Sequence, residues 1–600
     1  MSESDRISSY MLGLMQQYKV LRGKNKDSGP RPFWDVVVIT TLDEAQRMAF
    51  QLQIDEKHRR NELPLDLPIL IITDPPGIRI GNGGSTLIAL TYLEKEYGDK
   101  LSNKKVLLIH AGGWSQRMPS ASALGKIFSA LPHGQPIYQM LDFKLALYWP
   151  FVSKMEPGVL LTCADDFLVF DLGKDSDWSF PANGFTALAH PSPMAVGRTH
   201  GVYVLANPDI LDKQKPVVIA ECLEVLQKPS DERMRNRGAI LSGKKHVFAG
   251  GIELDGDVVY TDSCFYFGSD VVKKLIDLKK ELGSTEHEID AYGDFMQAVG
   301  LRASSDYIHL TSNISQVTPG LLQTRQQVFD HLKGTDIHLL ILNASKFIHI
   351  GTTKEYIYHL CHDKQFQSQM AFSKDVFNLW TEVHTAKRPK VDARDGCVMH
   401  SVLPSTSTVS SSAVIEYCHF DVRLVTGDNT ITSNCQYLSD MSKHCTEVIT
   451  IPEDCFLHTV PISVDGVTKY VTVFFHVDND LKKSVSIDKV RDIPFLTMTL
   501  QRFCDLLGWK VDDLSKEQNG AKINLWMLKL FPALESMTTS FHQSLSMLQT
   551  TLTQADGPRP AVCSSPLYAM ADLLRMKDVS AMLRYRHDLF EMIETGVKIC

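Results

Sequence analysis

The chain has 600 residues, of which 44% are hydrophobic and 22% are charged, and its formal net charge is −8 at pH 7. One hydrophobic core does not extend over this length, so we expect two or three domains of ordinary globular composition. Because the chain is acidic, we do not expect nucleic acid or an anionic membrane as its main partner. Any ligand phosphates would then be met by local cations.

The cysteines and the N-terminal residues indicate a cytoplasmic protein. The 12 cysteines are scattered, with no C-x-x-C pair and no framework spacing, which is typical of reduced thiols. The start, MSESDRISSYMLGLM, lacks the charged-then-apolar order of a signal peptide. No apolar run approaches the roughly 18 residues of a membrane span, so we expect no membrane partner.

Strands and helices alternate through the first part of the chain. They follow an N-terminal extension at 1–32, whose polar end RGKNKDSGPRP is expected to be a linker. The alternation predicts a parallel sheet with helices on both faces. The expected strands are at 35–39, 69–72, 106–110 and 158–162, and the expected helices are at 42–56 and about 81–97.

A glycine-rich loop follows the strand at 106–110. Its glycines let backbone N–H groups approach a bulky anion at the carboxyl edge of the sheet, where α/β folds bind ligands. Arg117 would grip phosphate oxygens in a fork, and Lys126 would add a point charge. The loop is not a Walker motif, which requires Ser or Thr after its lysine, because Ile127 follows Lys126. A surface turn with two cations is the alternative without a ligand. The loop residues assigned to the nucleotide are Ala111, Gly112, Gly113 and Ser115.

A second glycine turn, GNGGST at 81–86, precedes the helix that is expected to reach Tyr97. Its backbone and hydroxyls could hold a phosphate or the base at the helix N-terminus. A capped helix start, with Thr86 near the cap, is the alternative without a ligand. The residues assigned to nucleotide binding here are Gly81, Gly83, Gly84, Ser85 and Thr86.

Two adjacent carboxylates, Asp165 and Asp166, follow the strand at 158–162. A carboxylate at a strand end can hold a Mg²⁺ ion that also binds substrate phosphates, whereas a solvated turn is the alternative. Two more, Asp290 and Asp294, lie in the segment EIDAYGDF. Acidic residues at a helix start are also ordinary because of the helix dipole.

Five segments carry a family resemblance: GNGGSTL at 81–87, HAGGWSQRMP at 110–119, SALGKIFSALP at 122–132, CADDF at 163–167 and HIGTTKEY at 349–356. Together they resemble the fucose-1-phosphate guanylyltransferases, which are sugar-nucleotide pyrophosphorylases. The resemblance runs from about Phe33 to the C-terminus and thins after residue 360. It implies a Rossmann-like nucleotidyltransferase domain of GT-A type, an α/β fold with a mixed sheet, at 33–360.

The resemblance also implies roles for individual residues. Arg117 and Lys126 would be catalytic, and so would Lys228, whose segment VLQKP is similar to the family strand V-x-x-x-x-E-K-P. Gln227 stands where Glu is common, which leaves sugar recognition at that position open. The metal ligands would be Asp165 and Asp294, with Asp290 in reserve and Asp166 supporting the turn. The substrate-binding residues would be His200, Gly201, Asp262 and Asp290.

The implied activity is a Mg²⁺-dependent nucleotidyl transfer. GTP and L-fucose 1-phosphate would give GDP-L-fucose and pyrophosphate, as in fucose salvage. Two alternatives stay open: the same chemistry on another sugar 1-phosphate or nucleotide, and a catalytically silent nucleotide-sugar sensor. The spacing of the motifs does not decide between them, and the sequence leaves the oligomeric state undetermined.

The pattern changes again in the C-terminal part. Residues 397–440 are rich in Val, Ile, Ser, Thr and Cys, and several apolar residues recur six positions apart, such as Val414 and Phe420. Other such pairs are Val409 with Ile415 and Val425 with Ile431. This spacing predicts the coils of a left-handed parallel β-helix at 390–490. A few irregular strands are the alternative.

A helical region is expected at 491–600. Leu496, Leu500, Phe503 and Leu507 follow helical spacing, and Gly508 would end that helix. Further helices are expected within 522–552 and 567–597, separated by the Gly-Pro-Arg-Pro segment at 557–560. We find no residues for chemistry in this region, and no Ser/His/Asp triad or zinc-type cluster in the chain.

Overall fold

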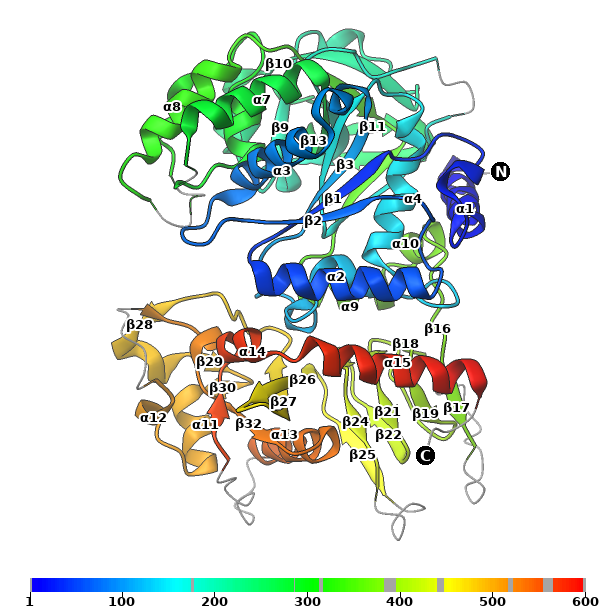
Figure 1. The fold of residues 1–600 in the computed structure, drawn as a ribbon, viewed down its shortest axis with the longest axis vertical. Helices are drawn as coiled ribbons and strands as arrows, with labels where there is room; N and C mark the ends of the chain where they lie inside the picture. The colour runs from blue at the N-terminus through cyan, green and yellow to red at the C-terminus, as the bar shows by residue number, and fades with distance from the viewer. Residues whose placement is uncertain are drawn as a thin grey trace. The chain divides into compact units, whose positions relative to one another are not determined.

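The computed structural model describes residues 3–173, 177–284, 286–311, 314, 317–382, 395–439, 447–515, 522–553 and 565–596. The chain forms two compact units, drawn in Figure 1. Unit 1 contains Met1–Gly113 and Leu141–His349, and unit 2 contains Trp114–Met140 and Ile350–Cys600. The segment 114–140, which the sequence analysis includes in the catalytic domain, therefore groups with the C-terminal part.

Unit 1 is built on a nine-stranded sheet of order β2-β1-β3-β6-β13-β8-β14-β10-β9. The first four strands are parallel, as the alternating pattern predicts. The next strand, β13, is antiparallel to both of its neighbours, and β10 is antiparallel to β14 and β9, so the sheet is mixed. The strands are β1 (Val36–Thr41), β2 (Ile69–Thr73), β3 (Lys105–His110), β6 (Gly158–Cys163), β8 (Phe185–Pro193), β9 (Gly201–Leu205), β10 (Val217–Gln227), β13 (Val258–Gly268) and β14 (Ile337–Leu342).

Helices cover this sheet, and two of them, α2 and α6, begin at a residue whose side chain caps the helix. The side chain of Asp43 accepts a hydrogen bond from the Gln46 N–H and so caps α2. The helix predicted after the GNGGST turn is α3, and it packs against α7, which packs against α8 (Figure 1). The helices are α2 (Glu44–Arg59), α3 (Gly81–Tyr97), α4 (Met140–Val152), α5 (Met194–Gly197), α6 (Asp231–Arg237), α7 (Ser269–Leu282) and α8 (Leu321–Leu332).

The N-terminal residues are part of unit 1. Helix α1 (Glu3–Leu21) buries one face, and Arg22 follows it in a buried ionic cluster. In that cluster Lys57 Nζ lies 2.9 Å from both Glu62 and Asp142, and Arg22 Nε lies 3.4 Å from Asp142. The buried side chains of the helix are Ile7, Met11, Leu14, Met15, Tyr18 and Leu21.

We expect the Asp142→Asn substitution to destabilise the protein by about 3–5 kcal/mol, because it removes one of the two carboxylates that face the buried cations Lys57 and Arg22. Asp142 has no exposed surface, so water cannot compensate. Urea denaturation measures the change. The matched control is Glu253→Gln, whose partner Lys245 is about half exposed, and it should change stability by less than about 1 kcal/mol. Equal urea midpoints for the two variants would contradict this prediction.

Unit 2 contains short parallel strands that repeat along the chain. Cys397 pairs with Val414 and Val414 with Ile431, a step of 17 residues. Residues six apart, such as Val414 and Phe420, lie on consecutive strands of different ladders. The three ladders are β16 (Asp375–Val376), β18 (Cys397–Met399), β20 (Val414–Glu416) and β23 (Ile431–Ser433); β17 (Leu379–Thr381), β19 (Val402–Pro404), β21 (His419–Phe420) and β24 (Gln436–Tyr437); and β22 (Arg423–Thr426) with β25 (Val448–Ile451).

Two long antiparallel strands, β26 (Cys455–Val464) and β27 (Val467–His476), continue the first ladder, and helices follow. The predicted helix before Gly508 begins at Leu500, because Leu496 has a φ of +53° and lies outside it. Part of the region expected to be helical is the strand β32 (Phe531–Leu534), and the segment 557–560 lies outside the described residues. The helices are α11 (Leu500–Leu507), α12 (Val511–Ser515), α13 (Met537–Thr553), α14 (Met570–Met576) and α15 (Val579–Thr595).

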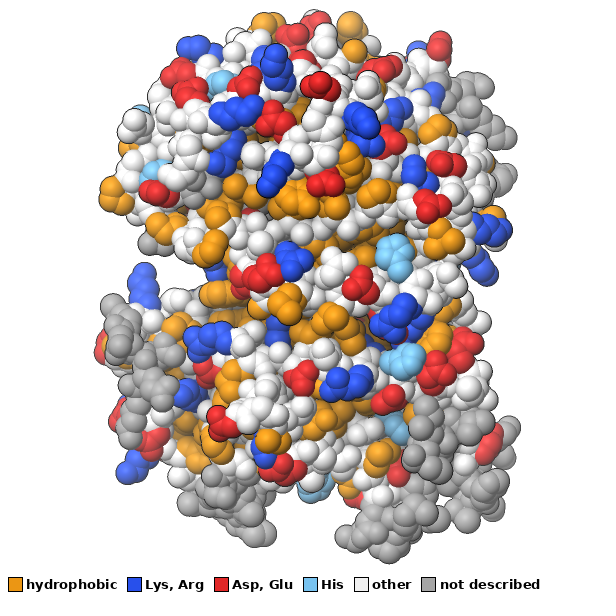
Figure 2. All heavy atoms as spheres, viewed as in Figure 1, with side chains coloured by type: hydrophobic (Ala, Val, Ile, Leu, Met, Phe, Trp, Pro, Cys, Tyr) orange, Lys and Arg blue, Asp and Glu red, His pale blue; other side chains and the backbone are white. Residues whose placement is uncertain are grey.

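Within the described ranges, none of the helices has the length and apolar character needed to cross a membrane. On the face shown in Figure 2, basic and acidic side chains are interspersed.

Burial lowers the pKa of His458 to about 3, and the charge of Arg586 acts in the same direction. In the unfolded chain this histidine titrates near 6.5. Below pH 6.5 the unfolded state therefore binds one more proton than the folded state, and this histidine makes stability fall as pH decreases. When the pH is lowered from 7.5 to 5, we expect the free energy of unfolding of wild type to fall by about 2 kcal/mol more than that of His458→Gln. Urea titrations at the two pH values measure this difference. A stability difference that does not change with pH would contradict this.

Candidate functional site

A cavity of about 250 Å³ opens in unit 1 where several strands end or begin. Strands β6 and β10 end at it, and β9 begins at it. Six of the predicted site residues meet there: Asp165, His200, Gly201, Lys228, Asp262 and Asp290. The rest of the lining is Asn82, Cys163, Asp166, Thr199, Gln227, Ser263, Tyr292, Phe347 and His349.

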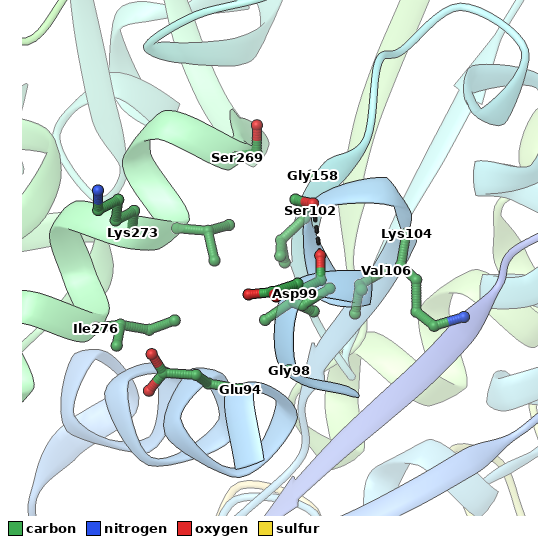
Figure 3. Close-up of a pocket in the computed structure, with 13 residues that line it drawn as sticks. Glu94, Gly98, Asp99, Ser102, Lys104, Val106, Gly158, Ser269, Lys273 and Ile276 are labelled. Carbon is green, nitrogen blue, oxygen red and sulfur yellow. Dashed lines mark hydrogen bonds between the residues drawn. The ribbon is translucent and has the colours of Figure 1, made fainter. Parts of the chain in front are cut away.

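A second cavity, of about 350 Å³, lies at the opposite ends of the parallel strands. Figure 3 shows residues of α3, α7 and the start of β3 around it, and its lining includes the charged residues Glu94, Asp99, Lys104 and Lys273. None of the predicted site residues lines this cavity. Because open α/β sheets bind ligands at the carboxyl ends of their strands, we take the first cavity as the candidate site.

The two adjacent aspartates after β6 have different surroundings. The Asp165 side chain is 23% exposed, and its Oδ2 lies 3.4 Å from His349 Nε2. Asp166 is buried and forms an ion pair with Lys144, which also donates to the Asp166 carbonyl oxygen at 2.6 Å. Asp166 therefore binds within the turn, and Asp165 is the more exposed carboxylate of the two.

Asp290, and not Asp294, lines the cavity with Asp165. Asp294 is fully buried: its Oδ1 accepts from Arg325 Nε at 2.7 Å, and its Oδ2 accepts from the Asp290 N–H at 2.8 Å. Burial raises the pKa of Asp294 to about 6, although Arg325 opposes the shift. Asp294 therefore does not line the same cavity as Asp165, but it lines a cavity of about 330 Å³ that also contains Lys228 and Asp290. Its role as a metal ligand stays a prediction.

Close backbone packing explains the glycines of the GNGGST turn. A Cβ at Gly81 or Gly83 would lie 2.4 or 2.8 Å from the carbonyl oxygen of Ile289, which accepts the Gly83 N–H at 2.8 Å. Asn82 Oδ1 accepts the N–H of Ala291, also at 2.8 Å. The turn thus holds the segment that carries Asp290.

The other residues of this turn have partners within unit 1. Ser85 donates to Asp74 Oδ1 at 2.6 Å, and Thr86 lies 2.9 Å from His110 Nε2. A Cβ at Gly84 would lie 2.8 Å from the Cβ of Ile80. Asn82 is the residue of the turn that lines the cavity, and nucleotide binding by Gly81, Gly83, Gly84, Ser85 and Thr86 stays a prediction.

The loop after β3 is shared between the units. Ala111, Gly112 and Gly113 belong to unit 1, where a Cβ at Gly112 would lie 2.9 Å from the Leu42 nitrogen and Gly113 has a φ of +138°. The remaining predicted residues, Ser115, Arg117 and Lys126, belong to unit 2. There Lys126 Nζ donates to the Gly351 carbonyl oxygen at 3.0 Å. The roles predicted for these loop residues are therefore not tested by the geometry of unit 1.

Asp262 and Gly201 form one wall of the cavity. The Gly201 N–H donates to Asp262 Oδ1 at 2.9 Å, and a Cβ at Gly201 would lie 2.3 Å from Asp262 Oδ2, so this contact requires glycine. Burial raises the pKa of Asp262, and His200 and Lys228 oppose that shift. Lys228 has a φ of +44°, which turns the chain at the end of β10. Gln227 Oε1, beside it, is buried and has no hydrogen-bond partner among the described residues.

A chain of buried side chains fixes the hydroxyl of Ser263. Ser345 donates to the Leu342 carbonyl oxygen at 2.5 Å, so it accepts from His190 Nδ1 at 2.6 Å. Burial lowers the pKa of His190 to about 3, so the ring is neutral and its Nε2 accepts from Ser263 at 2.7 Å. The Ser263 oxygen is therefore left as an acceptor. The chain contains no carboxylate, so it is not a catalytic triad.

The cavity lining also contains Asn82, Tyr292, Phe347 and His349, for which the sequence motifs predict no role. Asn82 and His349 lie inside the quoted family segments, which is the signal that could have identified them. Tyr292 donates to the Ser263 carbonyl oxygen at 3.3 Å, and burial raises its pKa well above 10. Nothing in the local sequence separates this tyrosine from a core residue.

The mixed α/β sheet gathers carboxylates and a lysine around one cavity at its strand ends, an arrangement that suits a ligand carrying phosphates. The fucose pyrophosphorylase domain family matches residues 98–536, and the chain belongs to that family. Human and mouse proteins named fucose-1-phosphate guanylyltransferase are each 38% identical to it. The human alignment covers 96% of this chain and 93% of the relative, and the mouse alignment covers 97% of each. The resemblance drawn from the five segments is confirmed.

Two more distant similarities complete the comparison. A bifunctional fucokinase/GDP-fucose pyrophosphorylase of Arabidopsis thaliana is 25% identical over 55% of this chain and 32% of its own length. A solved UDP-glucose pyrophosphorylase from Acinetobacter baumanii is 9% identical and covers 60% of this chain and 85% of its own. Its TM-score of 0.22 is too low to carry an argument about the fold.

Proposed function

We propose that this chain transfers a guanylyl group from GTP to L-fucose 1-phosphate, giving GDP-L-fucose and pyrophosphate in fucose salvage. The observation that carries the proposal is the 38% identity, over nearly the full length, to two proteins named for this activity. The cavity of unit 1 is consistent with it, because it combines Lys228 with four carboxylates and several hydrogen-bonding side chains.

The reaction needs positioning and charge neutralisation more than covalent help. An oxygen of the sugar phosphate attacks the α-phosphorus of GTP, a new P–O bond forms, and the bond to pyrophosphate breaks as its electron pair leaves with pyrophosphate. Lys228 would orient the attacking phosphate, and polar groups such as Ser263 and Asp262 would accept hydrogen bonds from sugar hydroxyls. The contacts of Arg117 and Lys126 with the triphosphate stay predictions from the family resemblance.

We propose Mg²⁺ as the cofactor. No group of three metal-ligating side chains comes together within the described ranges, but Asp165 and Asp290 line one cavity. This partial set fits Mg²⁺, which takes one or two carboxylates and completes its shell with phosphates and water. When bound, the ion would neutralise charge on the phosphates, and Asp165 and Asp290 would hold it.

We also propose a finer description of the fold. Unit 1 would be a Rossmann-like domain of GT-A type, and the ladders of unit 2 would form a left-handed parallel β-helix. The 17-residue step and the parallel pairing support the second assignment. A cytoplasmic location is proposed from the described cysteines, which form no disulfide with one another.

The test is a panel of nucleoside triphosphates and sugar 1-phosphates, with pyrophosphate release as the readout. We expect the highest kcat/KM for GTP with L-fucose 1-phosphate. A higher value for another pair would move the assignment to that substrate. No turnover with any pair, combined with binding of a nucleotide sugar, would favour the silent sensor.

A further inference from the structure

We propose that Arg325 and Asp294 form a buried pair that positions the carboxylate of Asp290 in the cavity. The inference rests on the proposed function, in which Asp290 helps to hold the metal–nucleotide complex. In this assignment Arg325 is a positioning residue, and Asp294 acts through Asp290 instead of binding the metal itself.

The pair ties three segments together. Arg325, on α8, is 4% exposed and donates from Nε to Asp294 Oδ1 at 2.7 Å. Its Nη1 donates to the carbonyl oxygens of Ile308, at 2.6 Å, and Leu310, at 3.1 Å. Tyr307 donates from its hydroxyl to the Asp294 carbonyl oxygen at 3.1 Å, and the guanidinium lies over its ring, 5.1 Å from the centroid. The segment 307–310 and the turn at Ala291–Phe295 are thus held to α8 by one side chain.

Asp294 passes this constraint to Asp290. Its second oxygen accepts the backbone N–H of Asp290 at 2.8 Å, so the backbone that carries the cavity carboxylate is fixed. Asp290 Oδ1 in turn accepts the Tyr292 N–H at 3.0 Å. A Cβ at Gly293 would lie 2.9 Å from Asp290 Oδ2, so glycine leaves room for this carboxylate.

The other side of the segment is held by the GNGGST turn. The Gly83 N–H binds the Ile289 carbonyl oxygen, and Asn82 binds the Ala291 N–H, both at 2.8 Å. Asp290 therefore lies between two anchored residues, with its own N–H anchored by Asp294. Both carboxylate oxygens of Asp294 already accept hydrogen bonds, which is why we assign it no ligand role.

A buried ion pair alone is weak support for stability, because desolvation offsets the attraction between the charges. Groups that orient metal ligands have a different effect: their loss typically lowers metal affinity by about 10–100-fold. The proposal therefore predicts a functional signature that a merely structural pair would not produce.

The experiment measures Mn²⁺ affinity of the full chain with GTP present, by electron paramagnetic resonance, for Arg325→Met, Arg325→Lys and Asp290→Asn. We expect Arg325→Met to weaken Mn²⁺ binding by about 10–100-fold, and Arg325→Lys to restore part of it. Because Arg325 acts through Asp290, the double variant should bind Mn²⁺ no more weakly than Asp290→Asn alone. The matched control is Arg235→Met, whose ion pair with Asp257 is exposed, and it should match wild type.

A folded Arg325→Met protein with wild-type Mn²⁺ affinity would overturn the proposal, and so would additive losses in the double variant. If Arg325→Met does not fold, Tyr307→Phe gives the second test: it removes one bond to Asp294, and a several-fold weaker Mn²⁺ affinity is expected. Unchanged affinity in that variant would count against the proposal. Failure of wild type to make GDP-L-fucose would overturn the proposed function instead, because the Mn²⁺ measurement does not depend on turnover.

Discussion

Replacing Asp165 with Asn should lower turnover by at least about 10²-fold, the scale of losing one electrostatic contact to the transition state. Asp165 lies at the end of β6 on the cavity, so the substitution removes charge where the metal and the phosphates are proposed to meet. Asparagine has nearly the same size and shape as aspartate, so the substitution should leave the fold intact. The measurement is the initial rate as a function of Mg²⁺ concentration, and excess Mg²⁺ should rescue the rate only in part.

Asp166→Asn is the matched control, since the two aspartates are neighbours in sequence but not in role. Asp166 forms a buried ion pair with Lys144, so its loss should lower the urea midpoint by the equivalent of about 3–5 kcal/mol. The initial rate of the Asp166→Asn protein that remains folded should depend on Mg²⁺ concentration in nearly the same way as the rate of wild type. An Asp165→Asn enzyme with normal rate and normal Mg²⁺ dependence would rule out the proposed metal site.

The second large effect is expected for Lys228→Met, which should lower kcat by about 10²–10³-fold. Lys228 lies at the end of β10 in the cavity lining, where a cation would hold the attacking phosphate in place. Methionine keeps the length of the side chain and removes its charge. Steady-state kinetics with varied sugar phosphate measure the effect, and KM for GTP should change least.

Lys215→Met is the control for this charge removal, because Lys215 is exposed and does not line the cavity. Its kinetics should equal those of wild type. If Lys228→Met kept normal kcat and normal KM for the sugar phosphate, Lys228 would be a surface lysine at a turn, and another group would have to orient the nucleophile.

The sequence predicted the parallel half of the sheet because strands buried on both faces are continuous apolar runs. The runs at 35–39 and 106–110 became β1 and β3, and the glycine turn opened α3 as expected. The antiparallel half was not predictable in the same way. All residues of β13 are buried, so its sequence carries no alternation that would fix its direction or its neighbours.

The site shows where local patterns stop being informative. Asp290 and Asp294 are four positions apart, and the sequence does not tell which of them faces the cavity. In the structure Asp294 binds Arg325, which lies on another helix 31 positions further along the chain. The local sequence around Asp294 does not reveal this partner. The glycines of GNGGST illustrate a related ambiguity, because close approach of an anion and close approach of another backbone segment both require a missing Cβ.

The most direct test of the central claim follows an oxygen label. L-fucose 1-phosphate with ¹⁸O in its phosphate is incubated with GTP, Mg²⁺ and the wild-type protein, and the products are analysed by mass spectrometry. If an oxygen of the sugar phosphate attacks the α-phosphorus, GDP-L-fucose carries all of the label and pyrophosphate carries none. Labelled pyrophosphate, or the absence of labelled GDP-L-fucose, would contradict the proposed reaction.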